Sequence, residues 1–155
     1  MSKSIKRVEK AAFGMGLSIN VVRMPDSTRT AVEAATMCDC EVGQIVKSLV
    51  FEGEVSGELI LLLVSGSHEV DLVKASQQIG QTLKRADPKR IRTETGFAIG
   101  GVAPFGHINA PQSWLDEELL SHDCVWAAAG APNSVFEINS RKLLEATGSK
   151  LIIVS

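Results

Sequence analysis

The stretch TGFAIGGVAPFGH, residues 95–107, decides how the rest of the chain is organised. It places four glycines and one proline among apolar residues, a composition that suits neither a long helix nor a regular strand. Flexible linkers are polar, so we expect this apolar loop to be packed in place. Glycine lets a ligand approach the main chain closely. The stretch is therefore a candidate wall of backbone N–H groups beside a pocket, and a packed turn without a ligand is the alternative.

The length and charge of the chain limit its class. Its 155 residues are predicted to form one domain, 1–155, and a charged fraction of 22% is ordinary for a soluble globular protein. A net charge of −2 gives no global attraction for nucleic acid, so an RNA partner would need a local basic patch. The longest apolar run, 59–64, is too short to cross a membrane, and the N-terminus lacks the apolar core of a signal peptide. We expect a cytoplasmic protein.

Strand and helix patterns alternate along the chain. Helices are predicted from apolar periodicity and capping residues, and strands from β-branched or continuous apolar runs. The first predicted helix ends near Gly14 or Gly16, and the second begins at a Thr30–Glu33 capping box. Three more helices are predicted: from Asp71 to Ile79, from Asp87 to about Thr93, and over 141–147 after a Ser140 cap. The predicted strands are 18–23, 45–51, 59–64, 82–85, 108–109, 124–129, 134–138 and 151–154, with a strand end and a helical turn over 114–120. This order predicts an α+β fold with a mixed, curved sheet.

Lys47 is the least comfortable residue in these strands. Alternation places it on one face of strand 45–51 together with Ile45, Leu49 and Phe51. A lysine among apolar side chains must either extend its ammonium to a rim or find an anionic partner. The sequence thus marks Lys47 as a candidate site residue.

The cysteines and histidines give few alternatives. Cys38, Cys40 and Cys124 do not have the spacing of a zinc site, so we expect neither a metal nor another cofactor. His68 follows a strand and His107 closes the glycine loop, so either could reach a pocket. The sequence has no nucleophile elbow, and no Gly-Lys-Ser/Thr ends the glycine loop as in a P-loop.

A basic cluster precedes the glycine loop. It contains Lys84, Arg85, Lys89, Arg90 and Arg92. A solvated helix face is the favoured interpretation, and a patch that follows a phosphate backbone is the alternative if the substrate is RNA.

Several segments together resemble the YbaK/ProX-type aminoacyl-tRNA deacylases, which are free-standing relatives of the editing insertion domain of bacterial prolyl-tRNA synthetases. The matching segments are STRT at 27–30 with AA at 34–35, QIVKSLVF at 44–51, SGSHEV at 65–70, TGF to GGVAPFG within 95–106, and AGAPN at 129–133. They run in order over essentially the whole chain. The IVKSL strand together with the glycine-proline loop is the most specific combination.

The resemblance implies a barrel-like mixed sheet flanked by helices, with a pocket for the terminal adenosine of tRNA and its amino acid. It implies hydrolysis of a wrongly formed aminoacyl ester without a metal. Lys47, Gly100 and Gly101 match the family's catalytic lysine and backbone loop. The remaining matched positions imply substrate contacts at Thr30, Ser65, His68, Val102, Pro104, Gly130 and Asn133. The implied partners are aminoacylated tRNA, prolyl-tRNA synthetase and, as a homodimer, a second copy of the chain, with no membrane.

The last hairpin bears on the amino acid that would be removed. The cysteinyl-type branch of the family tends to carry an acidic residue and a serine there, whereas residues 128–137 read AAGAPNSVFE and the chain has no tyrosine. The GSHEV segment is similar to the synthetase insertion domain and its alanine-clearing relatives. The resemblance therefore favours small residues, alanine first, on proline tRNA. A Cys-tRNA(Pro) deacylase and a non-catalytic module that binds tRNA ends or a synthetase are the alternatives.

Overall fold

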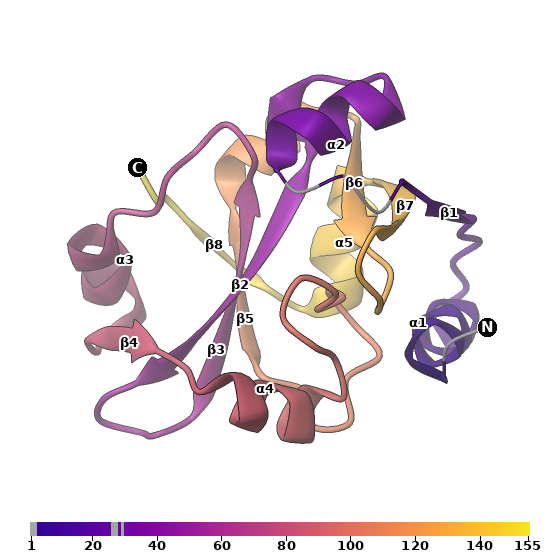
Figure 1. The fold of residues 1–155 in the computed structure, drawn as a ribbon. Coiled ribbons are helices and arrows are strands. Elements are labelled where there is room, and N and C mark those ends of the chain that lie inside the picture. The colour runs from indigo at the N-terminus through magenta and orange to yellow at the C-terminus, as the bar shows by residue number, and fades with distance from the viewer. Residues whose placement is uncertain (1–2, 26–27, 29) are drawn as a thin grey trace.

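The computed structural model describes residues 3–25, 28 and 30–155 (Figure 1). Its helices are α1 (Lys3–Gly14), α2 (Ala31–Cys38), η1 (Val42–Gln44), α3 (Leu72–Ile79), α4 (Pro88–Thr95), η2 (Glu117–Ser121) and α5 (Ser140–Thr147). Its strands are β1 (Val21–Arg23), β2 (Val46–Gly53), β3 (Leu59–Ser65), β4 (Leu83–Arg85), β5 (Gln112–Asp116), β6 (Cys124–Ala128), β7 (Ser134–Asn139) and β8 (Lys150–Ile152). Ser27 and Arg29 of the matched STRT segment lie outside the described residues.

The strands form two sheets. The five-stranded sheet has the order β4-β2-β3-β5-β8, with β3 parallel to β5, β5 parallel to β8, and the other pairs antiparallel. The three-stranded sheet is antiparallel, in the order β1-β7-β6. The predicted α+β class and the mixed sheet are therefore correct.

The predicted barrel-like closure differs from this arrangement. Among the described residues, one isolated parallel bridge between Ile45 and Trp126 joins the two sheets, and no closed barrel forms. The bridge lies just before β2 begins. Beyond it, Lys47 of β2 and Trp126 and Ala128 of β6 line the same cavity.

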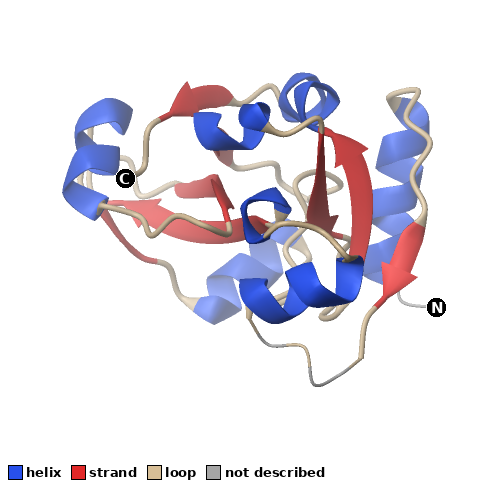
Figure 2. Cartoon of the chain, turned by 90° about the horizontal axis from the view of Figure 1, so that it is seen from above, coloured by secondary structure: helices blue, strands red, loops and turns tan. Residues whose placement is uncertain are grey.

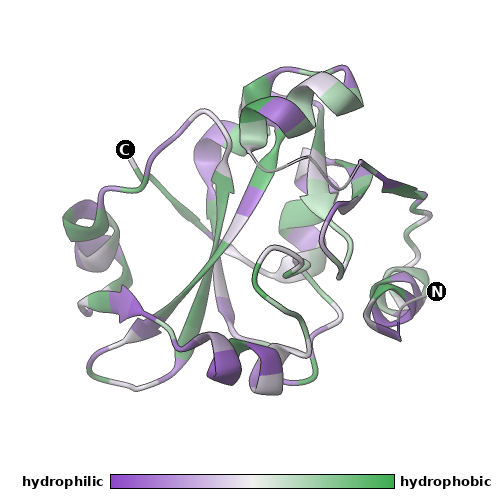
Figure 3. Cartoon of the chain, viewed as in Figure 1, coloured by the Kyte–Doolittle hydropathy of each residue, from purple (hydrophilic) through white to green (hydrophobic). Residues whose placement is uncertain are grey.

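The core is divided by β3, whose residues are all buried. Leu61 and Leu63 point into a cluster shared with the three-stranded sheet, α1, α5 and the glycine loop. Ile60 and Leu62 point to the opposite face, where Ala75 of α3 covers them. The period of two in a strand explains this division. Figure 2 shows the helices around the outside of the strands, and Figure 3 shows β3 as hydrophobic along its length.

Most predicted elements occur with small shifts at their ends. Asn139, rather than Ser140, caps α5, because its Oδ1 accepts the N–H groups of Arg141 and Lys142 at 3.1 Å each. The predicted strand 108–109 was wrong. Ile108 and Asn109 donate their N–H groups back to the carbonyls of Thr95 and Glu94, which closes the glycine loop instead of extending a sheet. None of the described helices has the length and apolar character needed to cross a membrane.

Candidate functional site

A cleft of 380 Å³ lies where α2, β2, the glycine loop and the start of β7 meet. Its walls are mostly apolar, as small-molecule sites usually are. Five of the residues proposed from the sequence line it together: Thr30, Lys47, Gly100, Val102 and Asn133. They come from four separate segments of the chain, so only the folded state brings them together. The cleft is therefore the candidate site.

Lys47 reaches the cleft from the second position of β2 and is half buried. Its Nζ donates to the main-chain carbonyl of His68. The sequence predicted either a rim position or an anionic partner, and the structure gives a neutral carbonyl oxygen instead. An ammonium has three donors, so two N–H groups remain for a ligand. No carboxylate of the described residues pairs with this ammonium, so its positive charge is held in place by a neutral group.

Asp116 anchors the segment that holds Lys47. Its side chain is 1% exposed, and its Oδ2 accepts the Ser65 N–H at 3.1 Å and lies 2.8 Å from Nδ1 of His68. Ser65 Oγ donates in turn to the carbonyl of Gly43 at 2.8 Å. Neither Ser65 nor His68 lines the cleft. Both lie behind Lys47 and fix the position of the carbonyl that it binds, rather than contacting the cleft as we predicted.

Two of the glycine-loop residues proposed from the sequence, Gly100 and Val102, line the cleft. Gly100 has a φ of 91° and is exposed, and within the described part of the chain neither its N–H nor that of Val102 has a hydrogen-bond acceptor. Gly101 differs, because its N–H donates to the carbonyl of Ala98 at 2.9 Å and closes a turn. Two amides, those of Gly100 and Val102, are thus available to a ligand, and the predicted Gly101 amide is occupied.

Gly101 and Gly130 have packing roles here, and Pro104 is buried below the loop. A Cβ on Gly101 would lie 2.9 Å from backbone atoms of Ala131, and one on Gly130 would lie 2.8 Å from the carbonyl oxygen of Ser4. None of these three residues lines the cleft. They support the residues that do.

His107 is a neutral part of the same support. Burial, together with the nearby positive charge of Arg7, lowers the pKa of His107 to about 4 against the opposing effect of the Ala103 backbone. Its ring packs edge-on against Phe97 with 5.4 Å between centroids. His107 does not line the cleft, so the loop offers backbone groups rather than an imidazole.

Cys38 and Cys40 pack against an apolar cluster that includes Met24, Ala34 and Ile45 of the cleft wall. Cys38 Sγ is 3.9 Å from Met24 Sδ, and burial raises the pKa of the Cys40 thiol to about 11. A thiol with so high a pKa stays protonated and is a poor nucleophile. Among the described residues, no three His, Cys, Asp or Glu side chains gather as a metal site would require.

Comparison with known proteins identifies the family of this chain. The model of the aminoacyl-tRNA editing domain matches residues 25–146. The chain belongs to the aminoacyl-tRNA editing domain family. The matched range contains Lys47, the glycine loop and Asp116, whereas α1 lies before it.

Members and relatives of this editing family match the chain over different lengths. The uncharacterized protein YwhH of Bacillus subtilis is 33% identical over 86% of this chain and 85% of its own length. The proline–tRNA ligase of Moorella thermoacetica is 35% identical over 50% of this chain, which is 13% of the ligase. A crystal structure of a candidate trans-editing enzyme for prolyl-tRNA synthetase superimposes with a TM-score of 0.92 and 46% identity, covering 100% of this chain and 98% of its own.

Sequence reasoning missed two residues of this region: Ser48, which lines the cleft, and Asp116, which lies beside His68 and does not line it. Asp116 is the last residue of β5. A single carboxylate directly after apolar strand residues was the pattern that could have marked it as a candidate. Ser48 follows Lys47, so alternation places it on the other face of β2, yet both residues line the cleft. The Ser48 hydroxyl is buried and has no partner among the described residues. It also lines a neighbouring cavity of 540 Å³ that shares Gly100 and Val102 with the cleft and is bordered by Arg85.

Proposed function

We propose that this protein hydrolyses the ester between tRNA and a wrongly attached small amino acid, alanine on proline tRNA first. The observation that carries the proposal is that Lys47, Gly100 and Val102 line one cleft, and that the N–H groups of Gly100 and Val102 have no acceptor among the described residues. Membership of the editing family and the full-length similarity to a candidate trans-editing enzyme support this chemistry. The partial similarity to proline–tRNA ligases supports proline tRNA as the carrier and that synthetase as a partner.

The residues of the cleft divide the reaction between them. Water adds to the ester carbonyl carbon, and the charge that develops on the carbonyl oxygen is accepted by the N–H groups of Gly100 and Val102. The bond from that carbon to the ribose oxygen then breaks, the ribose oxygen takes one proton of the attacking water, the other proton goes to the solvent, and the amino acid leaves as a carboxylate. The ribose of the substrate has a neighbouring hydroxyl that can orient the attacking water. Lys47 supplies fixed positive charge to the phosphate or carbonyl of the aminoacyl end.

The cleft also supports selection by size. Apolar side chains form most of its wall, and a closed, rigid pocket destroys only products small enough to enter, as in the second sieve of editing. Alanine fits this filter better than the bulkier proline ring.

The test measures deacylation of alanyl-, cysteinyl-, seryl- and prolyl-tRNA(Pro) by the wild type and by Lys47→Ala. We expect alanyl-tRNA to be cleared fastest, prolyl-tRNA to persist, and Lys47→Ala to reduce kcat/KM by about 10²- to 10³-fold, the range for losing one group that stabilises an oxyanion. Lys142→Ala is the matched control, because Lys142 is exposed on α5 and does not line the cleft. Tight binding of all four tRNAs without hydrolysis would instead identify a binding module, and fastest clearance of cysteinyl-tRNA would change the substrate.

A further inference from the structure

We propose that Arg7 of α1 is a positioning residue that ties together the two ends of the glycine loop, at Gly96 and Gly106, and so holds the amides of Gly100 and Val102 in place. The catalytic part of this inference rests on the proposed function. The structural part does not, because it concerns the conformation of the loop itself. Arg7 lies before the range matched by the editing-domain model, so the site in this chain is completed by a preceding helix.

The guanidinium bridges the two ends of the loop. Its Nη2 donates to the carbonyl of Gly96 at 2.7 Å, and its Nε donates to the carbonyl of Gly106 at 3.2 Å. Gly100 and Val102 lie between these two residues in the sequence. One planar side chain therefore fixes the distance between the start and the end of the segment that carries both available amides.

The loop needs such closure because it has no regular secondary structure between its ends. Two backbone hydrogen bonds join the ends of the loop: the Ile108 N–H donates to the Thr95 carbonyl at 3.0 Å, and the Asn109 N–H donates to the Glu94 carbonyl at 2.8 Å. Arg7 adds the next connection inward along the loop, between Gly96 and Gly106. Its guanidinium carbon also lies 4.9 Å from the centroid of the Phe97 ring, a cation–π contact within the loop.

The backbone of α1 is seated against the loop and against the neighbouring turn. A Cβ on Gly106 would lie 3.2 Å from the Arg7 carbonyl oxygen, and a Cβ on Gly96 would lie 2.3 Å from Arg7 Nη2. The close contact of Gly130 with Ser4 brings the turn before Asn133 to the same helix. Because Asn133, Gly100 and Val102 all line the cleft, α1 supports two of its walls from behind.

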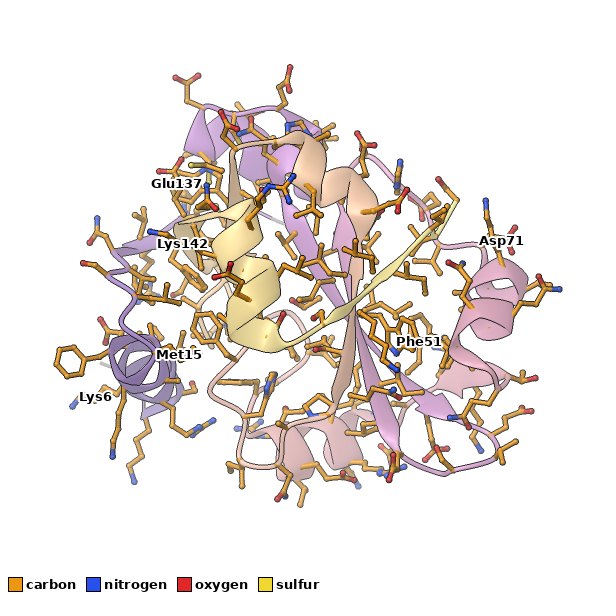
Figure 4. All side chains as sticks on the ribbon, turned by 180° about the vertical axis from the view of Figure 1, so that it is seen from behind. Lys6, Met15, Phe51, Asp71, Glu137 and Lys142 are labelled. Atoms are coloured by element: carbon orange, nitrogen blue, oxygen red, sulfur yellow. The ribbon has the colours of Figure 1, made fainter. Side chains whose placement is uncertain are left out.

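The first experiment measures amide hydrogen exchange of residues 96–106 in the wild type, Arg7→Ala, Arg7→Lys and Lys6→Ala. Lys6 is the matched control, because it is an exposed cation on the same helix and points outward from α1 (Figure 4). We expect exchange in the loop to rise about tenfold or more in Arg7→Ala, the change that follows the loss of about 1.4 kcal/mol of local stability. Lysine keeps the charge but not the planar fork, so Arg7→Lys should resemble Arg7→Ala. Lys6→Ala should match the wild type.

The second experiment measures deacylation by the same variants. Misplacing the amides should lower kcat by about 10- to 100-fold, as expected for a displacement of about 1 Å, while KM changes little. Added guanidinium should restore part of kcat in Arg7→Ala and not in Lys47→Ala. If Arg7→Ala does not fold, as judged by circular dichroism, Arg7→Lys decides the question.

The outcomes separate the two proposals. Unchanged loop exchange in both Arg7 variants would overturn the positioning role, whatever the activity. If the loop of Arg7→Lys alone exchanges like the wild type, the planar bridge is not required, and the positive charge at this position is sufficient to hold the loop. A wild type that hydrolyses no ester would refute the proposed function, and the exchange measurements would still decide the role of Arg7.

Discussion

His107, at the end of the glycine loop, has a pKa that the fold changes strongly. Burial removes water from its ring, and Arg7 adds a repulsive positive charge, so the pKa falls from 6.5 to about 4. The unfolded chain therefore binds a proton at a higher pH than the folded chain does. Folding stability from this residue is present in full above pH 6.5 and is lost as the pH falls toward 4.

We expect this loss to be measurable by urea denaturation between pH 7 and pH 4. The wild type should lose up to about 3 kcal/mol of unfolding free energy more than His107→Gln over this range, since each pKa unit corresponds to about 1.36 kcal/mol. His122→Gln is the control, because it removes a histidine near Glu41 instead. If the wild type and His107→Gln lose stability in parallel, His107 is not the group responsible.

At the scale of elements, the glycine loop and the turn before β7 pack directly against each other. Gly101 is the contact point, and the added Cβ of an alanine would meet the backbone of Ala131 at 2.9 Å. Backbone atoms cannot move aside as a flexible side chain can. The requirement for glycine at this position is thus steric, whereas at Gly100, with open space and a φ of 91°, it is conformational.

Gly101→Ala should therefore destabilise the protein and displace the loop. We expect the free energy of unfolding to fall by about 1–3 kcal/mol, the usual cost of overpacking, with an unchanged m-value in urea. Gly14→Ala is the control, because no atom lies within 4 Å of an added Cβ at the end of α1. That substitution should be neutral or stabilising by up to about 1 kcal/mol. Equal effects of the two substitutions would contradict the contact.

Much of the secondary structure could be predicted from the sequence. Capping residues marked the helix starts at Thr30, Asp71 and Asp87, because local hydrogen bonds decide where a helix begins. Residues 108–109 were assigned wrongly, because their β-branched and polar pattern gives no sign of bonds to Glu94 and Thr95. Pairing partners outside an element leave no trace in its own periodicity.

At the scale of the whole molecule, the charge distribution matters more than the net charge of −2. Figure 3 shows β4 and α4 as a hydrophilic region. Of the five basic residues in this region, Glu52 binds two: Lys84 at 3.0 Å and Arg90. The hydrogen bond from Lys84 holds the pKa of Glu52 below its usual value. Among the described residues, Arg85 has no acidic partner and borders the cavity beside the cleft.

We expect Arg85 to contribute to tRNA binding through phosphate. Arg85→Gln should weaken binding about equally for all tRNAs and reduce the slope of log K against log salt by about 1, the effect of one lost phosphate contact. Lys142→Gln, which removes a charge from α5 away from both cavities, should leave the slope unchanged. Filter binding across a salt series makes the comparison. Identical slopes for all three proteins would exclude Arg85 from the interface.

By itself, the sequence determined the α+β class and the central strands β2 and β3, and it singled out Lys47 and the glycine loop as candidate site residues. Those features follow from local rules of periodicity, capping and glycine chemistry. Only the tertiary structure decided which amides of the glycine loop lack an acceptor, what holds Lys47, and that among the described residues one bridge joins the two sheets. The physical reason is distance along the chain: Arg7 reaches Gly106, and Asp116 reaches His68, through contacts that no local pattern encodes.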